Sequence, residues 1–340
     1  MANYNKSEGV ELGFLITGEN DFPPKNSVLL IALQLSRFII SIKYQNHFSG
    51  RCQLGQERWY KGSLHAHTTE SDGDYPPEKV AEWHSEHGYD WLVLSDHNLL
   101  TRLEKHLRVP LMVPGEEITV ILEGHEKAVY VNSVGISKVV QPVDGGDVLG
   151  TLQKNVNAVL EVEGMASLCA PYFRPGFDHE SLKKVTGYRF IEVFNAHPLN
   201  VHGDPRTFSY EGIWDVILSS GQLVYGTATD DTHNYKDYGA DKANPGRAWV
   251  MTRGVELTEK TVLESLSRGD FYSSTGVVLN DIEITDRSIS VEIKPGLMQN
   301  FVTTFIGSEG RELDQQSGHE ATYKIRGGEG YVRARVDSSV

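Results

Sequence analysis

Two short stretches of the sequence carry side chains that could bind metal ions. His65 and His67 stand one residue apart, and an extended strand would place both imidazoles on the same side. Asp72 follows in a Ser-Asp-Gly turn, and His97 stands further along in an Asp-His-Asn triplet. Imidazole and carboxylate groups together bind Zn, Mn or Fe, which can activate water for hydrolysis. The residue types and their spacing therefore predict a metal site.

A strand–helix–strand unit would bring these side chains together. Residues 77–86 follow two prolines and carry apolar residues at helical spacing, and Gly88 is suited to end the helix. Trp91–Ser95 is a continuous apolar run typical of a parallel strand buried on both faces, and Asp96 and His97 follow its carboxyl end. In parallel α/β barrels this rim carries the catalytic residues.

These residues resemble a known signature. The chain reads Leu64–Thr68, Ser71–Gly73 and Asp96–Asn98, and it is similar here to the PHP family, the polymerase and histidinol phosphatase metallohydrolases. That signature consists of LHxHT, SDG, a helix, and a strand that ends in DHN. The likeness covers residues 58–276, and it implies an α/β fold, a distorted seven-stranded (β/α)7 barrel, and metal-dependent hydrolysis.

Further apolar runs supply the other strands and helices of such a barrel. Additional strands are predicted at 108–119, 128–136, 165–171, 190–195 and 223–231, and helices at 147–161, 178–185, 210–219 and 257–268.

The resemblance also assigns metal ligands. A Gly-x-Glu step corresponds to Glu117, and the final Asp-x-His corresponds to Asp231 and His233, with Asp230 an open alternative to Asp231. The resemblance implies a first metal ion bound by His65, His67, Glu117 and Asp231. It implies a second metal ion bound by Asp72, His97 and His233.

The third metal site of the family is incomplete in this chain. Its two histidines correspond to Tyr130 and Ala170, and neither residue supplies an imidazole. We therefore expect two divalent ions, Zn, Mn or Fe, with His125 as an open substitute ligand for a third.

Three residues beyond the ligands are candidates for substrate binding or catalysis. Arg174 follows the fifth strand and could bind an anion, while Asn195 and His197 follow the sixth, with His197 a candidate proton donor. The expected substrate is a small phosphate ester, and the alternative is a carbamate or amide, since residues after 246 resemble the branch that cleaves those bonds. A different class remains open, a metal-binding protein without catalysis whose terminal β modules bind a partner or glycan.

The two ends of the chain have other patterns. Residues 1–57 predict a small β cap, with strands in VELGFLI, SVLLIAL and RFIISIKY, although a non-native N-terminus is an alternative. Residues 277–340 alternate in short strands with Gly and Asp turns, which predicts a small antiparallel β module after the barrel at 58–276.

Composition and net charge narrow the classes of partner that the chain can be expected to bind. The chain has 340 residues and a net charge of −14, and no basic tract favours nucleic acid. No apolar run is long enough to span a membrane, and no clear signal peptide is present. The two cysteines lack CxxC spacing, so we expect the ligands to be histidine and carboxylate. The sequence leaves the oligomeric state and the cellular location open.

Overall fold

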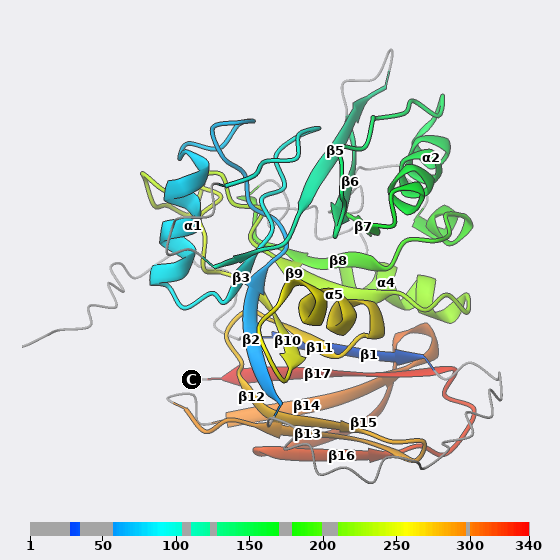
Figure 1. Ribbon diagram of the computed structural model, residues 1–340. Helices are drawn as coiled ribbons and strands as arrows, with labels where there is room; N and C mark the ends of the chain where they lie inside the picture. The colour runs from blue at the N-terminus through cyan, green and yellow to red at the C-terminus, as the bar shows by residue number, and fades with distance from the viewer. Residues whose placement is uncertain are drawn as a thin grey trace, which may run out of the picture.

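The computed structural model describes residues 57–103, 110–122, 128–169, 179–198, 210–296 and 300–339, together with the backbone of residues 28–34. Helices gather in one half of the molecule, and the other half consists of strands (Figure 1). The prediction of an α/β fold is confirmed. No helix in the described part of the chain has both the length and the apolar character needed to cross a membrane.

Eight strands in the helical half position the candidate ligands. They form one parallel trio and one five-stranded sheet. The trio consists of β2 (Arg58–Ser63), β3 (Trp91–Leu92) and β4 (Leu111–Met112), and the sheet of β5 (Gly115–Ile121), β6 (Ala128–Val134), β7 (Met165–Leu168), β8 (Phe190–Asn195) and β9 (Tyr225–Thr229).

Single bridges join these two groups of strands at the site. Ala66, beyond the end of β2, forms a parallel bridge with Thr232, beyond the end of β9. His97, beyond β3, forms a parallel bridge with Glu117 of β5. The strands are nevertheless assigned to separate sheets, and a closed seven-stranded barrel stays a prediction.

The expected third strand differs from the prediction. It is divided into β4 and β5 around Pro114, which has no N–H to donate to a strand ladder. At Gly115 a Cβ atom would lie 2.4 Å from the Ser133 carbonyl oxygen, so only glycine fits this close approach. β5 then pairs antiparallel with β6, and the six residues between the two strands are too few for the crossover helix that a parallel pair would need.

The helices follow the sequence signals closely. The helices are α1 (Pro77–Glu86), α2 (Val148–Glu161), α4 (Tyr210–Ser219) and α5 (Glu259–Arg268), while residues 178–185 contain the 3-10 helix η1 (His179–Lys184) instead of the predicted α-helix. Thr258 caps α5 through the Thr261 N–H, and Gly269 ends it with a φ of 79°. Gly88 likewise has a φ of 73° just after α1.

The other half is a β-sandwich. One layer contains β10 (Trp249–Gly254), β11 (Phe271–Ser274), β1 (Val28–Gln34), β17 (Tyr331–Ser339), β14 (Asn300–Gly307) and β15 (Arg311–Ser317). The second layer contains β12 (Leu279–Ile284), β13 (Ser288–Ile293) and β16 (Glu320–Lys324), and the short 3-10 helix η2 (Ser308–Gly310) precedes β15. Buried apolar side chains from both layers, such as Phe305 and Val291, form one core.

The sandwich is continuous with the helical half, because β10 pairs antiparallel with β2. β1 covers most of the predicted strand SVLLIAL and lies between β11 and β17. The other two predicted cap strands lie outside the described residues, and the domain boundaries after residues 57 and 276 stay predictions.

A buried ion-pair network also links the two halves. Arg333 of β17 donates to both carboxylate oxygens of Asp215 in α4, at 2.7 and 2.8 Å, and a further N–H reaches Glu211. Tyr331 donates to the same Asp215 carboxylate. These contacts fix α4 against the sandwich.

Candidate metal centre

The histidine pair lies at the centre of the site. The main chain beyond β2 is held by the His67 N–H, which donates to the Thr232 carbonyl at 2.9 Å. Both imidazoles are fully buried, and Nε2 of His65 lies 3.1 Å from Nε2 of His67. The two rings therefore direct ring nitrogens toward one point, as the alternation of the sequence predicts.

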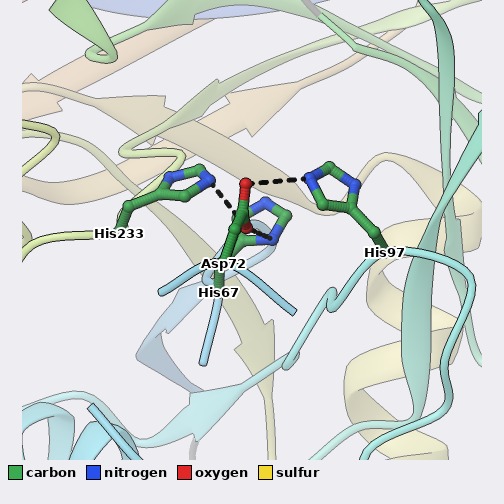
Figure 2. Close-up of side chains that lie close together, drawn as sticks. All are labelled: His67, Asp72, His97 and His233. Carbon is green, nitrogen blue, oxygen red and sulfur yellow. Dashed lines mark ion pairs between the residues drawn. The ribbon is translucent and has the colours of Figure 1, made fainter. Parts of the chain in front are cut away.

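Three further side chains surround the outer side of His67 (Figure 2). Asp72 lies between two histidines, with Oδ1 3.2 Å from Nε2 of His233 and Oδ2 3.4 Å from Nε2 of His97. Its Oδ1 also lies 3.5 Å from Nδ1 of His67. The turn that carries Asp72 requires Gly73, because a Cβ there would lie 2.5 Å from the His67 carbonyl oxygen. These four residues form the outer group.

Two carboxylates complete the inner side, Glu117, which is buried, and Asp231, whose side chain is 15% exposed. Glu117 Oε1 lies 3.5 Å from Nε2 of His65, and its Oε2 lies 3.4 Å from Nε2 of His67 and 3.1 Å from Nδ1 of His97. Asp231 Oδ1 lies 3.2 Å from Nε2 of His65 and 3.4 Å from Nε2 of His67. Glu117 thus reaches both the inner group, formed by His65, His67, Glu117 and Asp231, and the outer group.

The structure places Asp230 apart from this cluster. Its carboxylate accepts hydrogen bonds of 2.6 to 2.8 Å from the main-chain N–H groups of Gly246, Arg247 and Ala248. Asp231, with a left-handed φ of 49°, is the neighbour that points to the histidines. Asp96 is similarly occupied by hydrogen bonds from Thr68 and Ser71.

The remaining candidates have different positions. The ring of His197 packs edge-on against His233, with centroids 5.4 Å apart, so it borders the outer group. The ring centroid of Tyr130 lies 6.0 Å from that of His97. Arg174, His125 and Ala170 lie outside the described residues, and their predicted roles stay predictions.

Glu192 was not expected from the sequence. It lies on β8, and its Oε1 is 2.6 Å from Nδ1 of His65. The same carboxylate accepts hydrogen bonds from Thr229 at 2.8 Å and from Asn195 at 2.9 Å. A carboxylate that binds Nδ1–H of a histidine leaves Nε2 free to bind a metal ion. The available signal was a charged residue in the middle of an otherwise apolar strand, since a buried charge needs a partner.

Electrostatics keep the carboxylates ionised. Although burial opposes it, the neighbouring histidines lower the pKa of Asp72, Glu117 and Asp231 below the ordinary range. Burial would lower the pKa of His233, but Asp72 and Asp231 outweigh it and raise this pKa to about 9. The pKa of His65 rises well above its usual value for the same reason, with Asp231, Glu192 and Glu117 as the carboxylates.

The residues fit divalent metal ions. Among the described residues, histidines are the only basic side chains within ion-pair distance of Asp72, Glu117 and Asp231. Without a metal ion, protons on histidines such as His65 and His233 balance the charge of the three carboxylates. A bound divalent cation would replace those protons as the compensating charge. The donor atoms also lie close enough together, within 4.8 Å of one another in each of three groups.

Comparison with known proteins gave matches among solved structures only. No family model matches the chain, and the curated proteins gave no match. A two-domain protein from Bacteroides vulgatus containing a predicted PHP-like metal-dependent phosphoesterase is 14% identical, with a TM-score of 0.46, over 84% of this chain and 88% of that one.

Two further solved structures are similar over part of the chain. A putative metal-dependent phosphoesterase from Bifidobacterium adolescentis is 16% identical, with a TM-score of 0.41, over 61% of this chain and 96% of that one. An amidohydrolase from Chromobacterium violaceum with bound sulfate and no metal is 14% identical, with a TM-score of 0.37, over 54% of this chain and 93% of that one. At these TM-scores and identities, the chemistry of this chain does not follow from the likeness.

Proposed function

We propose that this protein is a metal-dependent hydrolase that acts on a small phosphate ester. The observation that carries the proposal is the convergence of His65, His67, Glu117 and Asp231 next to Asp72, His97 and His233. The first set would hold an inner ion and the second an outer ion, with Glu117 between them. We propose that two ions bind, and Zn, Mn and Fe all suit these donors.

The chemistry of hydrolysis would divide between metal and protein. When bound, such ions lower the pKa of a coordinated water and polarise the oxygen of a phosphoryl or acyl group. Glu192 would hold His65 in the tautomer that presents Nε2 to the ion. His197, whose ring packs against that of His233, would give a proton to the leaving group.

Exposure suggests the side from which substrate approaches. The side chains of His65 and His67 have at most 1% of their surface exposed, whereas Asp72 has 55% and His97 has 25% exposed. A substrate would therefore approach past Asp72 and His97, which would hold the outer ion, before it reached the buried side formed by His65 and His67.

We also propose that the strands of this half form a distorted seven-stranded barrel. The bridge between Ala66 and Thr232 connects β2 to β9, and the bridge between His97 and Glu117 connects β3 to β5. Both bridges lie at candidate ligands. The same contacts that would close the barrel would then also set the distances between the ligands.

The test is a substrate panel on chelated and reloaded protein. Phosphomonoester, phosphodiester, aryl carbamate and anilide substrates are assayed after exhaustive chelation and again after adding Zn, Mn or Fe. The proposal expects phosphate ester hydrolysis that disappears on chelation, returns with metal, and is abolished in His65→Ala and His97→Ala. Glu116→Gln is the matched control. Glu116 is the neighbour of Glu117 on β5, so its side chain projects from the opposite face of the strand, where it accepts a hydrogen bond from Val140 N–H.

The alternatives give different results. If only the carbamate or the anilide is cleaved, and cleavage depends on metal, the proposed substrate class is wrong and the proposed metal centre stands. Bound metal without turnover of any substrate would favour a binding protein that lacks catalysis. Activity that resists chelation would refute metal-dependent hydrolysis altogether.

A further inference from the structure

Cys169 lies within reach of the inner group. It follows β7, its side chain is buried, and its Sγ is within 4.8 Å of a His65 ring nitrogen and a Glu117 oxygen. Metal–ligand distances of roughly 2.0–2.3 Å allow two ligand atoms of one ion to lie up to about 4.5 Å apart. A small adjustment would let the sulfur share an ion with His65 and Glu117.

A second observation comes from Asn132 on β6. Asn132 is paired with Glu117 across the antiparallel β5–β6 ladder, so both side chains project from the same face of the sheet. Asn132 is 3% exposed, and its Oδ1 has no hydrogen-bond partner. A buried carbonyl oxygen without a partner costs free energy, and a cation would satisfy it.

The main chain of Asn132 contacts the sulfur as well. Its N–H donates to Sγ of Cys169 at 3.1 Å. Burial and the carboxylates of Glu192, Glu117 and Asp231 raise the pKa of the thiol, and the N–H hydrogen bond opposes them, so we expect the thiol to lose its proton when a metal ion binds. Asn132 thus donates its N–H to Cys169, and its side chain, with an oxygen that has no hydrogen-bond partner, projects from the face of the sheet that carries Glu117.

We propose that Cys169 is a thiolate ligand of the inner metal ion, with Asn132 Oδ1 facing the same ion. This inference rests on the proposed metal centre and deepens it. The inner ion would have a soft sulfur donor, while the outer ion, beside Asp72, His97 and His233, would have nitrogen and oxygen donors. Zn, Co and Cd would then favour the inner position over Mn and Mg. This proposal departs from the expectation that every ligand is a histidine or a carboxylate.

The test uses Co(II) as a spectroscopic probe. Chelated full-length protein is titrated with Co(II), and we expect a thiolate-to-cobalt charge-transfer band in the near ultraviolet together with the weaker visible bands of bound cobalt. The control is Cys52→Ser, which leaves Cys169 as the sole cysteine of the chain and should keep the band. Cys169→Ser should remove the band and keep the visible bands of cobalt bound by histidine and carboxylate.

Affinity provides an independent readout. Removal of a residue that hydrogen-bonds to a metal ligand lowers metal affinity by about tenfold or more, and removal of the ligand itself should lower it at least as much. Cys169→Ser should therefore weaken Cd(II) binding by at least about tenfold, with a smaller effect on Mn(II). Equal effects on the two ions would contradict a thiolate ligand.

The outcomes separate the two proposals. Cobalt bound by Cys52→Ser without a charge-transfer band would overturn the role of Cys169 and leave the metal centre in place. Failure of the wild-type chain to bind cobalt or zinc at all would overturn both. Because the band is measured in Cys52→Ser, the result does not depend on whether Cys169→Ser folds.

Discussion

Replacement of Glu192 by glutamine is a sharp perturbation of the proposed metal centre. The carboxylate accepts three hydrogen bonds, from His65 Nδ1 at 2.6 Å, from Thr229 at 2.8 Å and from Asn195 at 2.9 Å. Glutamine has nearly the same shape but only one acceptor oxygen. If its oxygen faces His65 and Thr229, its NH₂ group faces the NH₂ group of Asn195. If the side chain is turned over, its NH₂ group meets Nδ1–H of His65.

The magnitude follows from the role of this contact. Removal of the carboxylate that orients a metal-binding histidine costs about 10- to 100-fold in metal affinity, or about 1.4 to 2.7 kcal/mol. The hydrogen bond here is short, buried and charge-assisted, so we expect Glu192→Gln to reach the upper part of that range. The loss should fall on the inner ion, since Glu192 contacts His65.

The assay is competition between the protein and a chelator of known affinity, with metal content measured per chain. Wild type, Glu192→Gln and the control Glu116→Gln are compared at one pH. Glu116→Gln should bind metal as wild type does. Unchanged affinity in a folded Glu192→Gln protein would refute the assignment of His65 as an inner ligand.

Three further predictions concern pH, stability and the outer ion. Burial lowers the pKa of His84 to about 4, so the folded protein keeps this ring neutral while the unfolded chain binds a proton below its ordinary pKa near 6.5. This contribution to the free energy of unfolding is complete above pH 6.5, and about 3 kcal/mol of it is lost as the pH falls toward 4. In chemical denaturation, His84→Leu should show a smaller loss of stability between these two pH values. Arg333→Ala should cost about 3 to 5 kcal/mol, measured by the same method, because it leaves the buried Asp215 carboxylate without its guanidinium. Asp72→Ala should lower the metal content by about one ion per chain by elemental analysis, since it removes the carboxylate shared by His97 and His233. A loss of both ions would contradict the division into two groups.

Much of the site could be predicted from local sequence. The alternation that places His65 and His67 on one side is a property of any extended strand. Gly73 in the turn and Pro77 at the start of α1 also act locally, since Gly73 leaves room for the nearby His67 carbonyl and the ring of Pro77 fixes its own φ. Such features need no knowledge of distant partners.

The parts that were not predicted depend on long-range register. Glu192, Asn132 and Cys169 have no motif around them, and their proximity to His65 and Glu117 arises from the pairing of β5 to β9. The antiparallel pairing of β5 with β6 likewise differs from the arrangement that a (β/α)7 barrel implies. β15 was not predicted because its sequence, RELDQQS, is almost entirely polar, as suits an edge strand.

Anomalous scattering from crystals grown with Zn or Mn tests the central claim most directly. We predict two peaks in each chain, an inner one bounded by His65, His67, Glu117 and Asp231 and an outer one beside Asp72, His97 and His233. A third peak next to Tyr130 would contradict the expected number of ions. The absence of any peak within the cluster, in crystals that show the metal elsewhere on the protein, would contradict the metal centre itself.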